Sequence, residues 1–298
     1  MSSYPLQELA SALDGVDVTL DPRRIRVKSR DRYAISPLLR DMLADKQADA
    51  VVTPKTLDEL KHVVSTAVRL RIPITVRGGG SANYGQSVPL KGGIVLDMTA
   101  YSGIVALGNG TIRARAGTLV AEMDLAAKAT GWELRMHPTT ARIATIAGYV
   151  AGGTGGPGSV AYGILRDRGN IAAVQVLTME EQPRLLELTG PDAQLAHHTY
   201  GATGIITEVE MPLAPAWPWI EALVAFPDYL QAVRFGVSLA QQTGITRKVV
   251  SVQEWPVPRL IQPFAPLVPE GHSICSTMIA KGNLVAVSYT HLTLPTKA

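Results

Sequence analysis

Residues 73–86 read PITVRGGGSANYGQ, and this stretch decides how the rest of the chain is interpreted. Residues 72–76 form a short, mainly apolar run that is rich in β-branched side chains, which predicts a strand. Three consecutive glycines, 78–80, follow, and they let successive backbone N–H groups turn inward as a nest for an anion such as a pyrophosphate. A tight turn between strands explains the glycines alone equally well. The glycine stretch is not a Walker loop, because no Gly-Lys-Ser/Thr follows at the required spacing.

A second glycine cluster lies further along the chain. Six of the 27 glycines fall in residues 77–93 and eight in residues 148–169, which indicates two loops that approach something closely. Residues 153–158, GTGGPG, match the dinucleotide fingerprint GxGxxG formally. That fingerprint must follow a strand and open a helix, and Pro157 interrupts any such helix. We therefore expect a glycine-rich loop of another architecture here.

Hydrophobic periodicity around these clusters predicts an α+β fold. We expect strands over residues 50–52, 72–76, 94–98, 111–116, 133–137, 171–178, 184–189 and 205–212, and helices over 57–68 and 119–130. Thr56 and Glu59 form a capping box that begins the first of these helices. After Pro212, the run APAWPW reads as a linker, followed by a strand (220–226), a helix (229–243) and a strand (249–253).

The predicted organisation has four parts. Residues 1–48 are a helical and charged lead-in, 49–212 the main domain, 213–287 part of a second domain, and 288–298 a tail that resembles translated adapter sequence. We expect that the sequence is a truncated piece of a longer enzyme and that this piece alone is inactive.

Composition excludes several classes of protein. The chain has 298 residues, 46% of them hydrophobic, and no stretch of roughly 20 apolar residues that could span a bilayer. The basic run at residues 21–33 has a net charge of +4 and the rest of the chain is close to neutral, so nucleic acid is not expected as a partner. Cys275 is the single cysteine, and with no secretory signal this predicts a cytoplasmic protein.

Several motifs, taken in order, resemble the FAD-binding domain of the vanillyl-alcohol oxidase and p-cresol methylhydroxylase (PCMH) superfamily. They are the opening at Pro54, IPITVRGGGSANYGQ, GGIVLDM, ARAGTLVAEMD, Pro138 with TIAG at 145–148, the stretch 152–163, and YGATGIIT at 200–207. The resemblance spans residues 50–212, over half of the chain.

This resemblance implies a PCMH-type domain of two α/β subdomains that holds FAD, followed by the start of an incomplete α+β cap domain. The residues that would bind the cofactor are Arg77, Gly78, Gly79, Gly80, Ser81, Asn83 and Gly85 at the pyrophosphate, Pro138, Thr145, Gly148, Gly152, Ser159, Tyr162 and Gly163 on the ribityl and flavin side, and Ile205 at the adenine end. The chemistry would belong largely to the flavin.

Two positions depart from the family pattern. Ser81 stands where members with covalently attached flavin often carry histidine, which predicts dissociable, non-covalent FAD. Ala147 stands where many relatives have glycine.

No other residues form a catalytic constellation. His197 and His198 are adjacent, so on a helix they diverge by about 100 degrees and cannot share a metal, and we expect a surface or helix-end role for them. His137 precedes Pro138, beside a segment that lines the flavin by resemblance, and is a secondary candidate for a functional role. We expect no metal site and can name no catalytic base.

The expected function is hydride removal from an alcohol or 2-hydroxy acid carbon to flavin N5, with electrons passed to oxygen or another acceptor. A glycolate or D-lactate dehydrogenase type is preferred. The alternatives are a reductase resembling the one that acts on UDP-N-acetylenolpyruvoylglucosamine, and a non-catalytic FAD-binding module or subunit. Expected partners are a small-molecule substrate and either an electron acceptor or a second copy of the chain.

Overall fold

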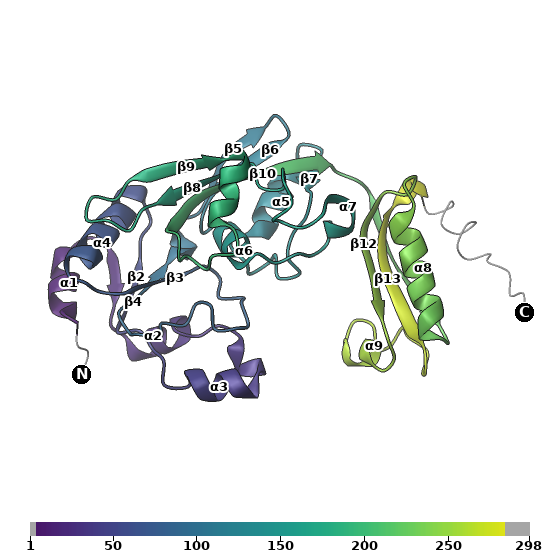
Figure 1. Cartoon of the computed structure of the whole chain (residues 1–298), viewed down its shortest axis with the longest axis horizontal. Helices are drawn as coiled ribbons and strands as arrows, with labels where there is room; N and C mark the ends of the chain where they lie inside the picture. The colour runs from purple at the N-terminus through teal and green to yellow at the C-terminus, as the bar shows by residue number, and fades with distance from the viewer. Residues whose placement is uncertain (1–3, 284–298) are drawn as a thin grey trace, which may run out of the picture. The chain divides into compact units, whose positions relative to one another are not determined.

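The structure is a computed structural model that describes residues 4–283. The chain divides into two compact units (Figure 1). The first runs from the N-terminus to Gly155 and resumes over Ile164–Ala214, and the second contains Gly156–Gly163 and the chain from Pro215 onwards. The predicted tail, 288–298, lies outside the described residues.

The first unit begins with a four-stranded sheet in the order β1-β2-β4-β3, in which β2, β4 and β3 run parallel. The strands are β1 (Asp17–Thr19), β2 (Ala50–Thr53), β3 (Ile74–Arg77) and β4 (Ile94–Asp97), and the helices packed with them are α1 (Leu6–Ala12) and α4 (Leu57–Arg69). Strands β2 and β4 are buried at every residue, as expected at the centre of a parallel sheet.

Helix α4 shows why this layer forms. Thr56 caps it, accepting a hydrogen bond from the Glu59 N–H at 3.1 Å, while the Glu59 carboxylate accepts from the Lys55 N–H at 2.7 Å. The helix then buries Leu60, Val63, Val64 and Ala67 in the core under the sheet. The predicted helix and its cap are confirmed, with the glutamate reaching one residue further back than a capping box requires.

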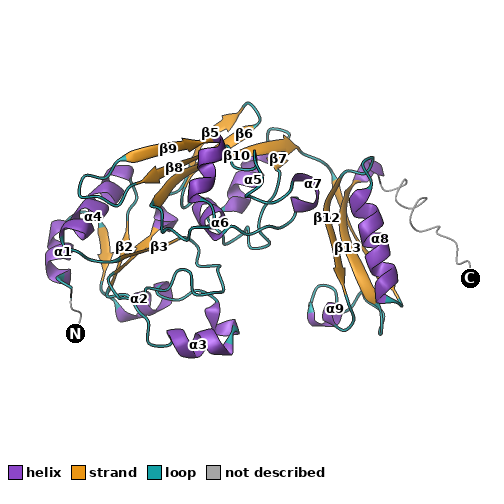
Figure 2. Cartoon of the chain, viewed as in Figure 1, coloured by secondary structure: helices purple, strands orange, loops and turns teal. Residues whose placement is uncertain are grey.

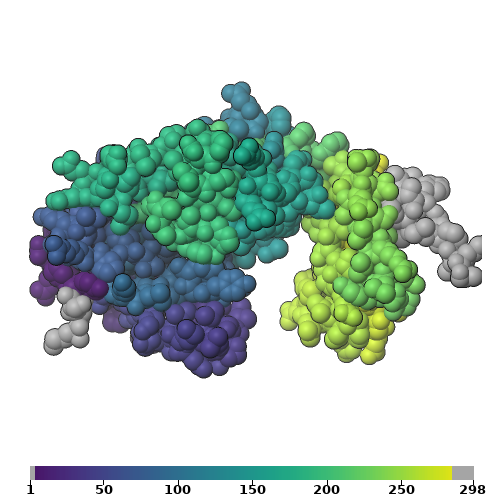
Figure 3. Space-filling view, in the orientation of Figure 1, coloured from purple at the N-terminus to yellow at the C-terminus, as the bar shows by residue number. Residues whose placement is uncertain are grey.

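Residues 1–48 contribute more than helices. Besides α2 (Pro22–Lys28), the 3₁₀ turn η1 (Tyr33–Ile35) and α3 (Pro37–Leu43), they supply strand β1, which pairs antiparallel with β2. Leu9 and Leu13 are fully buried in the core of the four-stranded sheet. Figure 3 shows this N-terminal part, in purple, on the surface of the first unit. The lead-in is therefore part of that unit's core, which its charged composition did not indicate.

The second sheet of the first unit has six strands, with β10 at its centre and β7 paired to β10. Its elements are β5 (Ile104–Gly108), β6 (Thr111–Arg115), β7 (Trp132–Leu134), β8 (Ala173–Leu177), β9 (Leu185–Thr189) and β10 (Ile205–Pro215), with α5 (Val120–Lys128), α6 (Ile146–Gly152) and the 3₁₀ turns η2 (Met98–Ala100) and η3 (Gly190–Ala196). The core between this sheet, α5 and α6 includes Ile112, Met123 and Tyr149 (Figure 2).

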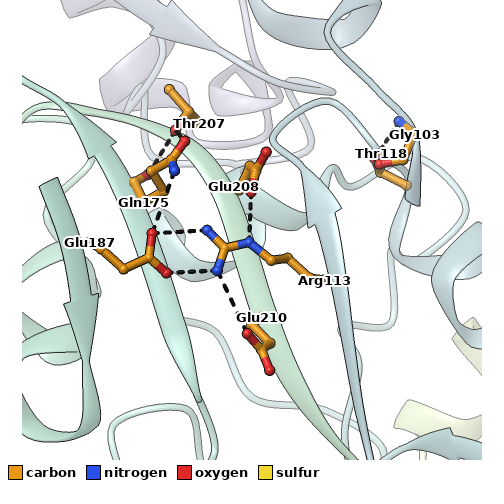
Figure 4. A network of polar contacts seen from close by, with 8 residues as sticks. All are labelled: Gly103, Arg113, Thr118, Gln175, Glu187, Thr207, Glu208 and Glu210. Atoms are coloured by element: carbon orange, nitrogen blue, oxygen red, sulfur yellow. Dashed lines mark hydrogen bonds and ion pairs between the residues drawn. The ribbon is translucent and has the colours of Figure 1, made fainter. Parts of the chain in front are cut away.

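The same sheet carries a network of charged side chains around Arg113 (Figure 4). Its guanidinium donates to Glu208 at 2.6 Å and to both carboxylate oxygens of Glu187 at 2.6 and 2.9 Å, and Glu210 lies 3.7 Å away. Gln175 extends the network to Thr207. These contacts join β6, β10, β8 and β9 across the sheet.

The second unit is a three-stranded antiparallel sheet in the order β11-β13-β12, with α8 packed on it. Its elements are α7 (Ser159–Tyr162), β11 (Trp219–Phe226), α8 (Tyr229–Gln241), β12 (Arg247–Gln253), α9 (Val257–Leu260), β13 (Ser273–Ala280) and the 3₁₀ turn η4 (Lys281–Asn283). Cys275 on β13 is buried beneath α8, and burial raises its pKa to about 11.

The α+β class is confirmed, and each strand and helix predicted for residues 50–253 has a counterpart. Periodicity did not predict β5, β13 or the short helix α6. Helix α6 is rich in small residues, IAGYVAG, so its sequence gives almost no apolar period.

Candidate functional site

A pocket in the first unit lies where the loop after β3 meets helix α6 and the segment leading into β10. It encloses about 770 Å³ of space free of protein atoms, including its open mouth. Its lining consists of Val76, Gly78, Gly79, Gly80, Ser81, Ala82, Gln86, Ser87, Met98, Thr145, Ala147, Gly148, Ala151, Gly152, Tyr200, Gly201, Gly204 and Ile206. The two glycine-rich regions of the sequence therefore meet at one site.

The glycine loop fits too tightly against its neighbours to admit side chains. A Cβ at Gly78 would overlap the Thr145 hydroxyl, and one at Gly79 would overlap the Ile143 carbonyl oxygen. Gly80 has a φ of 63°, in the left-handed region that favours glycine. The three glycines therefore let the backbone itself form the wall of the pocket.

The same loop offers hydrogen-bond donors. Within the described part of the chain, no hydrogen bond uses the backbone N–H groups of residues 79–82. Successive free amides next to a cavity form a nest that suits a phosphate or pyrophosphate. This cradle of glycine backbone and free donors fits the FAD that the sequence predicts.

Helix α6 provides the facing wall. Thr145 caps it by accepting a hydrogen bond from the Gly148 N–H at 3.3 Å. Thr145, Ala147, Gly148, Ala151 and Gly152 all line the pocket, and they are small. Ala147, which departs from the family's glycine, is therefore a wall residue whose methyl group the site accommodates.

Charged residues are buried beside the glycine loop, within the protein. Arg77 is only 8% exposed, and its Nη1 donates to the Arg30 carbonyl at 2.7 Å and to Ser87 Oγ at 3.3 Å. Burial lowers the pKa of Arg77, while Asp97 and Asp31 act in the opposite direction. A Cβ at Gly80 would overlap this guanidinium. Arg77 thus supports the loop from within.

Two further ion contacts complete this cluster. Lys28 on α2 pairs with the buried Asp97 at 2.5 Å. Asp31 accepts a hydrogen bond from the Tyr33 N–H at 2.8 Å, and burial raises its pKa despite nearby backbone amides and Arg77. Residues 28–31, from the predicted lead-in, therefore brace the glycine loop.

The structure brings together about half of the predicted cofactor residues. Gly78, Gly79, Gly80, Ser81, Thr145, Gly148 and Gly152 line the pocket. Arg77, Asn83, Gly85, Pro138, Ser159, Tyr162, Gly163 and Ile205 do not line it. Ser159, Tyr162 and Gly163 belong to the second unit, where the Gly158 N–H donates to the Lys248 carbonyl at 2.7 Å. Contact of these eight residues with a cofactor stays a prediction.

Sequence reasoning missed one wall of the pocket. Tyr200, Gly201, Gly204 and Ile206 line it, although only Ile205 of that segment was predicted as a site residue. The motif YGATGIIT could have indicated this wall, because its glycines at φ 83° and 127° have conformations that favour glycine. Among the described residues, no group of three or more His, Cys, Asp or Glu side chains is placed to hold a metal ion.

Comparisons with known proteins point to the same cofactor. Residues 48–182 match the family model described as "FAD binding domain". The chain is 26% identical over 225 residues to glycolate oxidase subunit GlcD of Bacillus subtilis, covering 73% of this chain and 48% of that protein. It is 28% identical over 206 residues to a D-lactate dehydrogenase of Archaeoglobus fulgidus, covering 64% and 45% respectively.

Solved structures show the same fold. An alkyldihydroxyacetonephosphate synthase superposes with a TM-score of 0.78 at 18% identity, covering 98% of this chain and 59% of that one. The BBE-like 1 protein of Physcomitrella patens superposes with a TM-score of 0.69 at 17% identity, covering 96% and 59%. At these identities the likeness concerns the fold alone.

The fold, the glycine cradle and the family match define an FAD-binding domain of the PCMH type. Residues 48–182 therefore form an FAD-binding domain, and the chain is related to glycolate oxidase subunit GlcD and D-lactate dehydrogenase. It spans about half the length of these curated relatives. No helix in the described residues is long and apolar enough to cross a membrane.

Proposed function

We propose that this chain is the FAD-binding part of an oxidoreductase that removes a hydride from an alcohol or 2-hydroxy acid carbon, of the glycolate or D-lactate type. The observation that carries the proposal is the loop of residues 78–82, where glycine backbone and unengaged amides border one pocket. The curated relatives named glycolate oxidase subunit and D-lactate dehydrogenase support the substrate class.

The chain's own residues bind and orient the cofactor in this proposal. The amides of residues 79–82 hold the pyrophosphate, and the hydroxyl of Ser81 is a further donor. Bound FAD would supply the hydride acceptor at N5. Serine at position 81 has no ring nitrogen for the flavin to alkylate, so no covalent link forms through this position, and we expect dissociable FAD.

The electrons removed from the substrate pass to oxygen or another acceptor. The GlcD relatives are named as a subunit, which supports an assembly with partner subunits. A cytoplasmic location is likewise a prediction from the cysteine content.

The first experiment is the visible spectrum of the purified chain before and after acid precipitation. We expect a flavin spectrum whose colour moves to the supernatant. Colour in the pellet would disprove the non-covalent link. Gly79→Ala should lose the flavin, because its Cβ overlaps the Ile143 carbonyl. The matched control is Gly244→Ala, whose Cβ would meet no atom within 4 Å and which should bind flavin as the wild type does.

A second experiment tests the reaction. Anaerobic addition of glycolate or D-lactate to the flavin-loaded enzyme, lengthened to the full extent of its GlcD relatives, should bleach the flavin absorbance, because we expect this chain alone to be inactive. Bleaching by NADPH and not by the hydroxy acids would favour the reductase alternative. A flavin-loaded protein that neither donor reduces would favour the non-catalytic module.

A further inference from the structure

Tyr200 is the one aromatic side chain in the lining of the pocket within the described residues. It lies in the turn before β10, and it is 46% exposed, so its ring is not buried in the core. The motif analysis gave it no role. Its position raises the question of what an aromatic ring does at this wall.

The phenol of Tyr200 is held in place by a second side chain. His198 Nε2 lies 2.6 Å from the Tyr200 hydroxyl, and the two rings meet edge to face with centroids 5.1 Å apart. This hydrogen bond and ring contact fix the orientation of a side chain that would otherwise move freely.

The backbone of the same turn is fixed on helix α6. The His198 N–H donates to the Val150 carbonyl at 3.0 Å, and the Tyr200 N–H donates to the Ala151 carbonyl at 3.1 Å. His198 and Tyr200 both have positive φ, at 57° and 52°. Such left-handed conformations are uncommon outside glycine and are concentrated at functional sites.

The wall of the pocket around Tyr200 is apolar. Val76, Ala151, Gly201 and Ile206 line the same pocket. Only 3.7 Å would separate a Cβ at Gly201 from Val76, so the turn lies against the end of β3. A flavin ring shares its site with a substrate and with groups that move protons. Apolar walls without a free ionisable group suit the adenine ring, which only has to be held.

We propose that Tyr200, oriented by His198, is a stacking contact for the adenine ring of the dinucleotide. The inference rests on the proposed function and deepens it, because it assigns one end of the cofactor to a named wall. Tyr200 touches the cofactor in this arrangement, and His198 acts through Tyr200 as a positioning residue.

Binding of ADP, which carries the adenine and pyrophosphate but no flavin, tests the proposal. Removal of an aromatic stacking partner costs about tenfold in affinity. Tyr200→Ala should therefore weaken ADP and FAD by about the same factor, measured by calorimetry on the full chain. The matched control is Tyr84→Ala, a tyrosine that is 71% exposed and lies outside the pocket lining, and it should bind both ligands as the wild type does.

The positioning role of His198 has its own readout. Tyr200→Phe keeps the ring but loses the hydroxyl, and His198→Ala loses the partner, so each should weaken ADP about threefold. The double variant should be no weaker than His198→Ala alone, because His198→Ala already removes the hydrogen bond that Tyr200→Phe removes. Additive losses would overturn the positioning role.

The outcomes separate this inference from the proposed function. If the wild type binds FAD and ADP while Tyr200→Ala binds ADP unchanged, the stacking contact is wrong and FAD binding stands. A loss for FAD alone would place Tyr200 at the flavin end and would also overturn it. If the wild type binds neither ligand, the proposed function fails, and the inference fails with it. Far-UV circular dichroism and thermal unfolding confirm that each variant is folded.

Discussion

Arg77 and Arg113 both face carboxylates in the first unit, yet their surroundings are opposite. Arg113 saturates its guanidinium with Glu187 and Glu208, and these partners raise its pKa. Arg77 is buried beside the glycine loop, its Nε has no hydrogen-bond partner among the described residues, and burial lowers its pKa. One arginine joins strands across a sheet, and the other supports a ligand loop.

The difference shows where the molecule accepts an unfavourable environment for a charge. A well-paired, partly exposed arginine contributes modestly to stability, because water could solvate the same groups in its absence. A buried charge is costly unless it is paired, so removal of one partner leaves the others uncompensated. Two such buried charges, Arg77 and Asp97, lie beside the glycine loop.

The largest expected effect is that of Arg77→Met. Loss of this buried cation removes compensation from Asp31 and Asp97 and leaves the loop without its support at Gly80. We expect the free energy of unfolding to fall by about 3 kcal/mol, together with loss of FAD. Urea unfolding of the apoprotein and a flavin spectrum measure the two effects. A variant that unfolds normally and retains flavin would refute the supporting role of Arg77.

Lys28→Met tests whether the predicted lead-in braces the loop. It leaves the carboxylate of Asp97, whose side chain is 3% exposed, without its partner at 2.5 Å. We expect a loss of about 2 kcal/mol in unfolding free energy and weaker FAD binding by calorimetry. Lys46→Met is the control, because Lys46 pairs with Asp45, whose side chain is 74% exposed. An equal effect of the two variants would contradict the bracing role.

Arg113→Met should cost only about 1 kcal/mol in unfolding free energy and leave FAD binding unchanged. The three glutamates around it remain partly hydrated, so their repulsion is screened. The loss should shrink in high salt, whereas that of Arg77→Met should not, because buried charges are screened much less. If Arg113→Met were the more damaging variant, the comparison between the two arginines would be reversed.

Asp31→Asn should give the smallest effect, and its sign is a gain. Burial raises the pKa of Asp31, so the folded state binds the proton more tightly than the unfolded chain, and stability falls as pH rises through that pKa. Asparagine keeps the oxygen that accepts the Tyr33 N–H. The variant should therefore be more stable than the wild type at pH 7, and the difference should vanish below pH 3.8, the usual pKa.

Thermal unfolding against pH measures this difference. The control is Asp41→Asn, on a side chain that is 79% exposed, and it should follow the wild type at every pH. A loss of stability at neutral pH in Asp31→Asn would mean that the ionised carboxylate is better paired than burial implies.

Much of the first unit could be predicted because local patterns agreed with the fold. The capped helix α4 and the buried strand β2 each carry a clear period and a clear start. Glycines 78–80 predicted the loop, and the structure requires glycine there because a side chain would overlap neighbouring atoms. Strand β1 and helix α6 have no such pattern. Strand β1 forms because it pairs with β2, and α6 forms because Ile146 and Tyr149 pack into the core of the second sheet.

The sequence by itself determined the class of domain and part of its pocket, because glycine and periodicity act locally. Only the tertiary structure decided the rest. It turned Arg77 inward, away from the pocket lining, and brought Lys28 to Asp97 from 69 residues away. It also placed Tyr200 against α6 through His198. These contacts join residues with no common local pattern, so their free energy exists only once the chain has folded.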